Sequence, residues 1–200
     1  MTSNIAQHNI MNLFAEFASW FFGRIGDAVL PRPSIPMKPY LPERILEIAE
    51  TQLGIVESSR NQGDGIEKYW EATNYPDGYK NREPYCAAAV CWIVREAMGS
   101  SIAWTFKRPQ SATAFGFETW SLKQDASTNT KKNPRGDIRP GDLVIFKFSH
   151  IGIAATAADK TGHFRCIEAN TGPSGERDGD GVWKKNRHID LVRSRIRFTV

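Results

Sequence analysis

Helical and strand-like periodicities are segregated along this chain, and this segregation is the feature that most restricts its fold. Before residue 100, helical spacing of apolar residues marks PERILEIAETQLG (42–54), IEKYWEAT (66–73) and CAAAVCWIVREAM (86–98). After residue 140, strand patterns mark DLVIFKF (142–148), HIGIAATA (150–157), HFRCIEAN (163–170), GDGVWKKNR (179–187) and RSRIRFTV (193–200). Helices followed by a set of strands predict an α+β fold, with the helices packed on an antiparallel sheet.

The first part of the chain differs in composition from the segments just described. Residues 1–30 are apolar at near-helical spacing and predict a helical appendage. Residues 31–41 are rich in proline and predict an extended linker, which leaves residues 42–200 as the compact domain. No basic stretch precedes the first apolar run, and Glu16 and Asp27 interrupt it, so it fits neither a signal peptide nor a membrane span. It either packs on its own domain or docks on a partner or a membrane surface.

The cysteine count excludes a disulfide scaffold. Cys86, Cys91 and Cys166 are three thiols and cannot all pair within one chain. On a helix, positions 86 and 91 lie roughly 140° apart at about 100° per residue, so the two thiols face different ways. Structural zinc needs about four ligands with closely spaced Cys/His pairs, and the sequence offers no such set. We therefore predict no metal, no cofactor and a free reactive thiol.

The charge of the chain is mildly basic and uneven. There are 26 Lys and Arg against 22 Asp and Glu, a formal net charge of +4. The excess gathers near the C-terminal end, in Lys184, Lys185, Arg187, Arg193, Arg195 and Arg197. Two interpretations stay open: a solvated edge strand blunted by charge, or attraction to an anionic polymer. No RNA- or DNA-binding signature accompanies the charges, so nucleic acid is not the expected partner.

Cys86 stands where a helix is expected to begin. Pro84 restrains the backbone just before it, and the three alanines that follow let the helix pack closely. The unpaired N–H groups and the positive dipole end of a helix start both lower the pKa of a thiol. Cys91 lies more than one turn further into the helix. We therefore predict a reactive thiol at Cys86 and an ordinary packing thiol at Cys91.

A nucleophilic thiolate also needs a base, and His150 is the best placed of the four histidines. It heads a strand, and Gly152 and the alanines after it leave room for another chain or a substrate. A lone strand histidine is more often structural, but the next strand supports a functional assignment. In FRCIEAN the side chains alternate, so Cys166, Glu168 and Asn170 point to one face. A carboxylate or an amide there would hold the imidazole in its tautomer and stabilise it once charged.

The order of PYCAAAV, GDLVIF, SHIGIA, EANTG and GDGVWKKNR resembles the CHAP domain, a family of cysteine- and histidine-dependent amidohydrolases and peptidases related to NlpC-type cell-wall hydrolases. The resemblance covers roughly residues 42–200 and implies a papain-like core. It also implies that Cys86 is the nucleophile, His150 the general base and Glu168 the acid that orients the imidazole. Asn170 matches an amide often found in the same site.

Three further positions follow from this resemblance. Tyr85 stands where many relatives carry Trp, which implies an aromatic position that contacts substrate. GIVESSRNQG resembles an early segment of the family, in which Glu57 and Asn61 either line the cleft or stabilise a loop. Some relatives bind calcium through alternating acidic residues before the cysteine. YPDGYKNRE lacks that alternation, so we expect no metal here.

The resemblance implies hydrolysis of an amide bond in peptidoglycan, either the N-acetylmuramoyl-L-alanine bond or a bond within the peptide stem or crossbridge. Without a signal peptide, we expect a phage lysin or a delivered antibacterial effector that acts on the wall outside the cytoplasm. Residues 1–41 would then dock on delivery machinery or on an inhibitor. The alternatives are a non-catalytic wall-binding or structural module, and an intracellular thiol peptidase or transferase of the same fold. The oligomeric state is left open.

Overall fold

The computed structural model describes residues 40–100, 104–174 and 178–200 of the chain. The chain divides into two compact units, residues 1–37 and residues 38–200, and the description covers the second. The predicted appendage and nearly all of the predicted linker lie outside the described residues.

Most of the helical structure of the described residues precedes the sheet, as predicted. The helices are α2 (Leu41–Glu50), α3 (Glu67–Trp70), α4 (Cys86–Met98) and α5 (Gly116–Ser121), with 3₁₀ turns at Pro76–Gly78, Asp125–Ser127 and Ile189–Leu191. Helix α4 has the predicted bounds. Helix α2 ends before the predicted cap. Gly54 ends the turn that follows, with a φ of 83°, and its N–H donates to the Val182 carbonyl oxygen. Helix α5 was not predicted.

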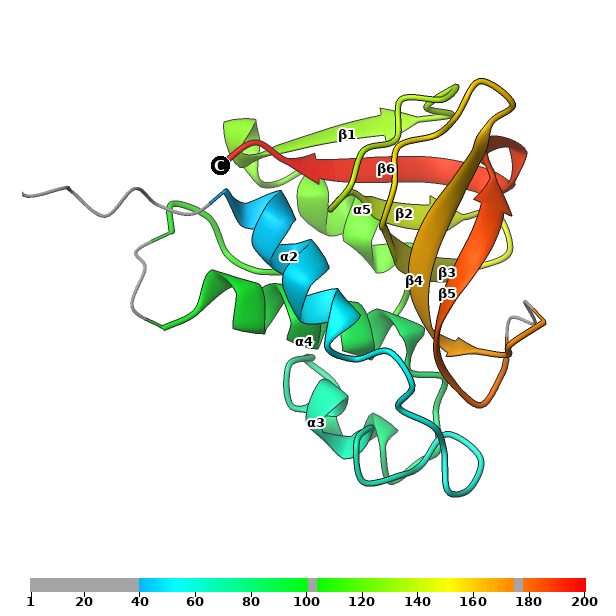
Figure 1. The fold of residues 1–200 in the computed structure, drawn as a ribbon. Helices are drawn as coiled ribbons and strands as arrows, with labels where there is room; N and C mark the ends of the chain where they lie inside the picture. Colours follow the sequence, from blue (N-terminus) through cyan, green and yellow to red (C-terminus); the bar gives the residue numbers. More distant parts are fainter. Residues whose placement is uncertain (1–39, 101–103, 175–177) are drawn as a thin grey trace, which may run out of the picture. The chain divides into compact units, whose positions relative to one another are not determined.

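The strands form one antiparallel sheet in the order β1-β6-β2-β3-β4-β5 (Figure 1). They are β1 (Thr128–Lys132), β2 (Leu143–Phe146), β3 (His150–Ala154), β4 (His163–Thr171), β5 (Gly181–His188) and β6 (Val192–Phe198). Five of them lie in the predicted segments. Strand β1 was missed, because its sequence TNTKK carries no apolar alternation and pairs only with β6 at the sheet edge.

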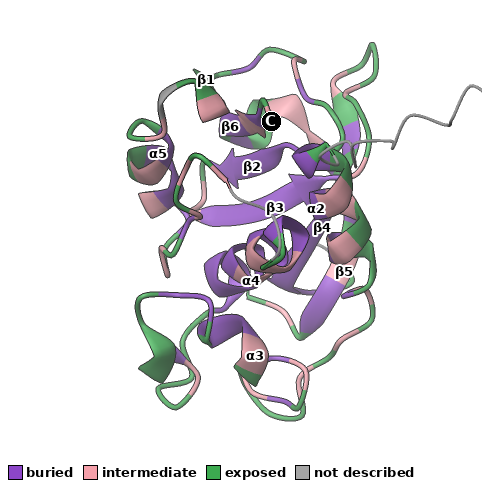
Figure 2. Cartoon of the chain, turned by 90° about the vertical axis from the view of Figure 1, so that its left-hand side faces the viewer, coloured by how far each residue is buried: buried purple, intermediate pink, exposed green. Residues whose placement is uncertain are grey.

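Two apolar cores lie on the two faces of this sheet. On one face α2 and α4 pack against residues such as Ile151, Ile153 and Ile167, and this is the larger core (Figure 2). On the other face Val144, Phe164 and their neighbours form a smaller core. The alanines that open α4 are fully or almost fully buried, and their small side chains bring the helix close to the strands. The predicted α+β class with an antiparallel sheet is thus confirmed.

The C-terminal cations lie in part on an edge strand and do not form a free basic patch. Strand β5 is at the edge of the sheet, but β6 lies between β1 and β2. The six cations all have partners. On β5, Lys184 pairs with Glu50 at 3.1 Å, Arg187 pairs with Glu168 at 2.6 Å, and Lys185 donates to the Gly172 carbonyl oxygen at 2.9 Å. On β6, Arg193 pairs with Glu118 at 2.9 Å, Arg195 with Asp137 at 2.8 Å and Arg197 with Asp142 at 2.7 Å. The run joins β5 and β6 to the rest of the fold.

Among the helices that the structure describes, none has the length and apolar character needed to cross a membrane.

Candidate active site

Cys86 is the first residue of α4 and is 7% exposed. No side chain caps this end of the helix, so the first backbone N–H groups are left for a ligand or for the thiol itself. The N–H of Tyr85, the residue before the helix, donates to Asn170 Oδ1 over 3.3 Å. This bond fixes the chain that leads into Cys86 to the end of strand β4.

His150 is the first residue of β3 and is almost completely buried. Ser149 has a left-handed φ of 59° and ends the turn that joins β2 to β3. The imidazole stacks against Phe148 and Phe146, with centroid distances of 5.9 and 6.0 Å. Aromatic contacts on the ring restrict its rotation and keep water from it. His150 is therefore held in one orientation.

The electrostatics of Cys86 and His150 show that the two side chains are coupled. Burial alone would raise the pKa of the Cys86 thiol, but the charge and hydrogen bond of His150 and the N–H groups of Ile151 and Ala87 outweigh it, so this pKa is lower than usual. Burial alone would lower the pKa of His150, but the Cys86 thiolate and Glu168 raise it to about 9. A low thiol pKa beside a high imidazole pKa favours the thiolate–imidazolium pair.

Glu168 contacts the imidazole at Nε2. Its Oε2 is 3.1 Å from His150 Nε2, in the geometry of an ion pair rather than of a well-aligned hydrogen bond. Glu168 faces Gly152 across the β3–β4 ladder. A Cβ at Gly152 would lie 2.6 Å from Glu168 Cγ and 2.7 Å from Cys166 Sγ. The space that the sequence suggested for a substrate is filled by these β4 side chains.

Asn170 does not share the environment of Glu168, contrary to the predicted alternation. A bulge interrupts the β4–β5 register between Ala169 and Thr171, and Asn170 has a left-handed φ of 57°. Its side chain binds the Tyr85 N–H and lies 3.5 Å from Asp178 Oδ1. The bulge redirects the amide from the imidazole to the start of α4. Asn170 is thus placed to hold the backbone at Cys86.

The three predicted substrate contacts lie in different environments. Tyr85 is fully buried, and its ring stacks on Tyr69 at 6.0 Å, so this side chain belongs to the core rather than to an accessible cleft surface. Glu57 Oε2 accepts the Asn61 N–H at 2.6 Å, and Asn61 Nδ2 donates to the Arg82 carbonyl oxygen at 2.7 Å. The loop is therefore tied to the segment that precedes Cys86. Glu57 and Asn61 also line a cavity of which Cys86 is not part, and their contact with substrate stays a prediction.

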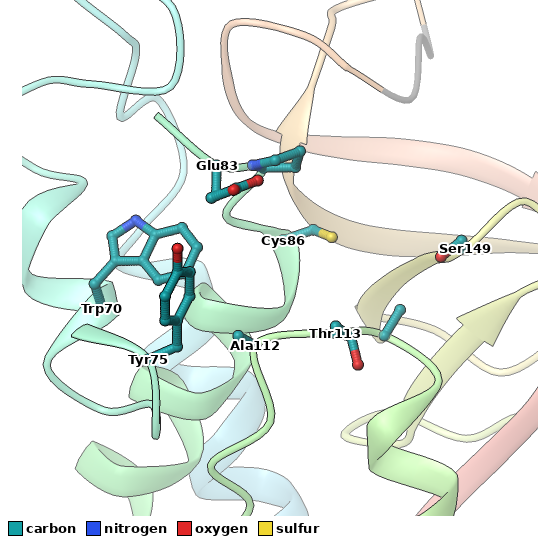
Figure 3. Close-up of a pocket in the computed structure, with 9 residues that line it drawn as sticks. Trp70, Tyr75, Glu83, Cys86, Ala112, Thr113 and Ser149 are labelled. Atoms are coloured by element: carbon teal, nitrogen blue, oxygen red, sulfur yellow. The ribbon is translucent and has the colours of Figure 1, made fainter. Parts of the chain in front are cut away.

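Two cavities meet at Pro84. One, of about 330 Å³, is lined by Cys86 together with Trp70, Tyr75, Glu83, Thr113 and Ser149. Figure 3 shows that the sulfur of Cys86 points away from Trp70 and Tyr75 and toward Ser149. The other cavity, of about 460 Å³, contains Glu57, Asn61 and Asp178. A substrate that spans Pro84 would present its scissile bond to Cys86 with groups on both sides.

The remaining thiols have the structural character that the sequence predicted for Cys91. Cys91 is fully buried, and its Sγ donates to the Ser111 carbonyl oxygen over 3.3 Å. Burial raises the pKa of the Cys91 thiol to about 12. Burial also raises the pKa of Cys166, which lies in the smaller core. Of the three thiols, Cys86 is the one whose environment favours ionisation.

Arg187 and the residues that line the cavity beside Cys86 were not predicted. Arg187 was assigned to a basic run, although period-two alternation along β5 already separates Lys185 and Arg187 from Lys184. That alternation was the available signal. Trp70 ends helix α3, and Tyr75 and Thr113 lie in loops, so no local pattern indicated that the three line one cavity.

Within the described ranges, no group of three or more His, Cys, Asp or Glu side chains is arranged to hold a metal ion. Comparisons with protein-family models, with curated proteins and with solved structures gave no match. The resemblance to the CHAP family stays a prediction that depends on the order of the motifs.

Proposed function

We propose that the protein is a papain-like cysteine amidohydrolase or peptidase that cleaves an amide bond in peptidoglycan. The observation that carries the chemistry is the row Cys86–His150–Glu168, in which a thiol at a helix start, an imidazole and a carboxylate follow one another beside a cavity. A buried Cys–His pair with an orienting acid is the arrangement that activates a thiol for attack on a carbonyl group.

The first half of the reaction forms a thioester. The Cys86 thiolate attacks the carbonyl carbon of the amide, and the negative charge moves to the carbonyl oxygen. The uncapped N–H groups at the start of α4, that of Cys86 among them, donate to this oxyanion. When the tetrahedral intermediate collapses, the C–N bond breaks and His150 gives its proton to the leaving amine.

The second half releases the acyl group. Neutral His150 takes a proton from water, which attacks the thioester carbonyl carbon. The C–S bond then breaks, the product leaves as a carboxylic acid, and the thiolate–imidazolium pair forms again. Glu168 stays ionised throughout and stabilises the imidazolium.

The substrate class depends on the resemblance and on the shape of the site. Cavities on both sides of Pro84 suit a branched or extended peptide better than a small amide. The cavity beside Cys86 combines the Glu83 carboxylate with hydroxyl and aromatic groups, and the other cavity has carboxylates, the Asn61 amide and Arg60. These linings suit a peptide stem with polar side chains. We further propose delivery to the wall by a phage or a secretion system, with the chain before Leu41, where α2 begins, as the docking segment. Deleting residues 1–38 should leave wall hydrolysis in vitro intact.

Digestion of purified peptidoglycan tests this function. Zymography with several wall types, followed by mass spectrometry of the released muropeptides, should show a cleaved amide and identify the bond. Cys86→Ala is the matched negative control, and Cys91→Ala should remain active. If no wall type is cleaved by the folded protein, while a thiol-reactive acyl probe labels Cys86, an intracellular thiol peptidase or transferase becomes the better assignment. If the probe does not label Cys86 either, a non-catalytic binding module becomes the better assignment.

A further inference from the structure

We propose that Arg187 is a positioning residue whose guanidinium clamps Glu168 in the orientation that contacts His150, and so maintains the Cys86–His150 pair. This inference rests on the proposed function for its meaning, since a positioned Cys–His pair matters only where the thiol reacts. Its observable consequence, the ionisation of Cys86, is independent of any substrate.

The clamp has two points of contact. Arg187 Nε donates to Glu168 Oε1 over 2.8 Å, and Arg187 Nη2 donates to Glu168 Oε2 over 2.6 Å. Two parallel bonds fix both the position and the plane of a carboxylate, which a single contact cannot do. The oxygen that receives Nη2 is also the one that lies 3.1 Å from His150 Nε2. Turning the carboxylate would therefore break both contacts together.

The strand register shows why a long side chain is needed. Across the β4–β5 ladder Arg187 faces Phe164, whereas Glu168 faces Trp183. Arg187 thus starts four residues away from the level of Glu168 and must reach back along the sheet. It does so from an edge strand whose other cations bind different partners. A surface arginine that met a carboxylate by chance would not be 8% exposed.

The same two aromatic rings enclose the guanidinium and the imidazole. Arg187 Cζ lies 5.5 Å from the Phe146 ring and 5.6 Å from the Phe148 ring. His150 stacks on the same two rings. This enclosure excludes water and so strengthens the electrostatic contacts among the three charged groups.

The charge balance around Glu168 depends on this arginine. The ionisable groups that face the carboxylate and the imidazole are Cys86 from α4, Cys166 from β4 and Arg187 from β5. Burial would raise the pKa of Glu168, and the hydrogen bonds from Arg187, followed by the contact with His150 and its charge, hold this pKa below its usual value. Without Arg187 the buried carboxyl group would take up a proton or turn away. In either case the imidazolium loses its counter-charge.

A purely structural buried ion pair is the competing explanation, and the chain offers a matched control for it. Arg195 on β6 is also buried and pairs with Asp137 over 2.8 Å, and its contacts are Asp137 and Asn129. Neither residue belongs to the candidate site. Arg195→Ala should therefore lose a comparable ion pair without any effect on Cys86.

The test is the pH dependence of alkylation of Cys86 by iodoacetamide in the full chain, read by mass spectrometry of the peptide that contains Cys86. Wild type, Arg187→Ala, Arg187→Lys and Arg195→Ala are compared. Cys91 and Cys166 are fully buried. Cys166 lies on a different peptide, and fragmentation within the peptide 83–95 distinguishes alkylated Cys86 from Cys91, which shares that peptide. In Arg187→Ala the apparent pKa of alkylation should rise by about one unit, so that the rate falls about tenfold at pH values below the wild-type apparent pKa. The apparent pKa of Arg187→Lys, which keeps one contact instead of two, should lie between those of wild type and Arg187→Ala. The apparent pKa of Arg195→Ala should match that of wild type.

A wild-type profile, or a lower apparent pKa, in folded Arg187→Ala would overturn the clamp. If that variant does not fold, Arg187→Lys decides in the same way: a raised pKa supports the clamp and a wild-type profile overturns it. Because alkylation needs no wall substrate, the outcomes stay separate. A raised pKa without wall hydrolysis in the wild type would refute the proposed function and leave the clamp standing.

Discussion

Replacing Gly152 by alanine tests the packing that brings Glu168 to His150. The added Cβ would lie 2.6 Å from Glu168 Cγ, 2.7 Å from Cys166 Sγ and 2.8 Å from the Ile167 carbonyl oxygen, all below the 3.0 Å that real Cβ contacts respect. One of these atoms belongs to the backbone, so a rotamer change cannot relieve all three contacts. Strands β3 and β4 must separate locally, or Glu168 must move.

The cost of this overpacking can be estimated. Inserting a methyl group into a filled core costs about 1–3 kcal/mol. For a chain of this size, each kcal/mol lowers the melting temperature by roughly 2–4 °C. We therefore expect Gly152→Ala to melt roughly 2–12 °C below wild type in a thermal scan followed by circular dichroism. Wall hydrolysis should fall as well, because displacement of Glu168 weakens its contact with His150.

Two further variants identify the cause. Cys166→Ala in the Gly152→Ala background removes the sulfur contact, so it should restore part of the stability but little of the rate, since the contact with Glu168 Cγ remains. Gly136→Ala is the control: nothing lies within 4 Å of its Cβ, but its φ of 88° makes alanine unfavourable, by about 1–2 kcal/mol. It should be destabilised with unchanged hydrolysis. A Gly152→Ala protein with wild-type melting temperature and rate would refute the close packing.

The other predictions concern the reacting groups. Cys86→Ala should lower the hydrolysis rate by several orders of magnitude, and Cys91→Ala should cost about 1 kcal/mol of stability in urea denaturation with the rate kept; equal rate losses in the two folded variants would contradict the assignment. Glu168→Gln should lower the rate by about 10²–10⁴, and should destabilise by about 3–5 kcal/mol because buried Arg187 loses its carboxylate counter-charge; a wild-type rate would exclude the orienting role. Hydrolysis should follow a bell-shaped pH profile that rises as Cys86 ionises below the ordinary thiol range and falls near pH 9 as His150 loses its proton; a rate that continued to rise above pH 10 would contradict the ion pair. Asn170→Ala should lower the rate less than Glu168→Gln, and a larger loss would reverse the two roles.

Features of this fold that depend on local signals could be predicted from the sequence. Helix α4 begins at Cys86 as expected, because the proline before it and the alanines after it act over a few residues. Period-two alternation in β4 placed Glu168 and Cys166 on one face, and both approach Gly152. The same alternation predicted the wrong orientation for Asn170, because a bulge adds a residue to β4 at this point and no local sequence pattern indicates it. The same bulge decides which of the two side chains reaches the imidazole.

The role of the C-terminal cations could not be predicted from local patterns, because it depends on ion pairs with residues far away in the chain. The partners of Lys184 and Arg193 are Glu50 and Glu118, far away in the chain. Composition counts such cations as net charge, whereas each is paired at the surface with a carboxylate of α2 or α5. The net charge of +4 therefore does not describe unpaired cations over this run, and attraction to an anionic wall polymer stays a prediction. The proposed wall substrate depends instead on the resemblance and on the shape of the site. Salt dependence separates the two explanations: hydrolysis governed by the site should change little as ionic strength rises from about 0.05 to 0.2 M, whereas adsorption through a cationic surface would weaken steeply.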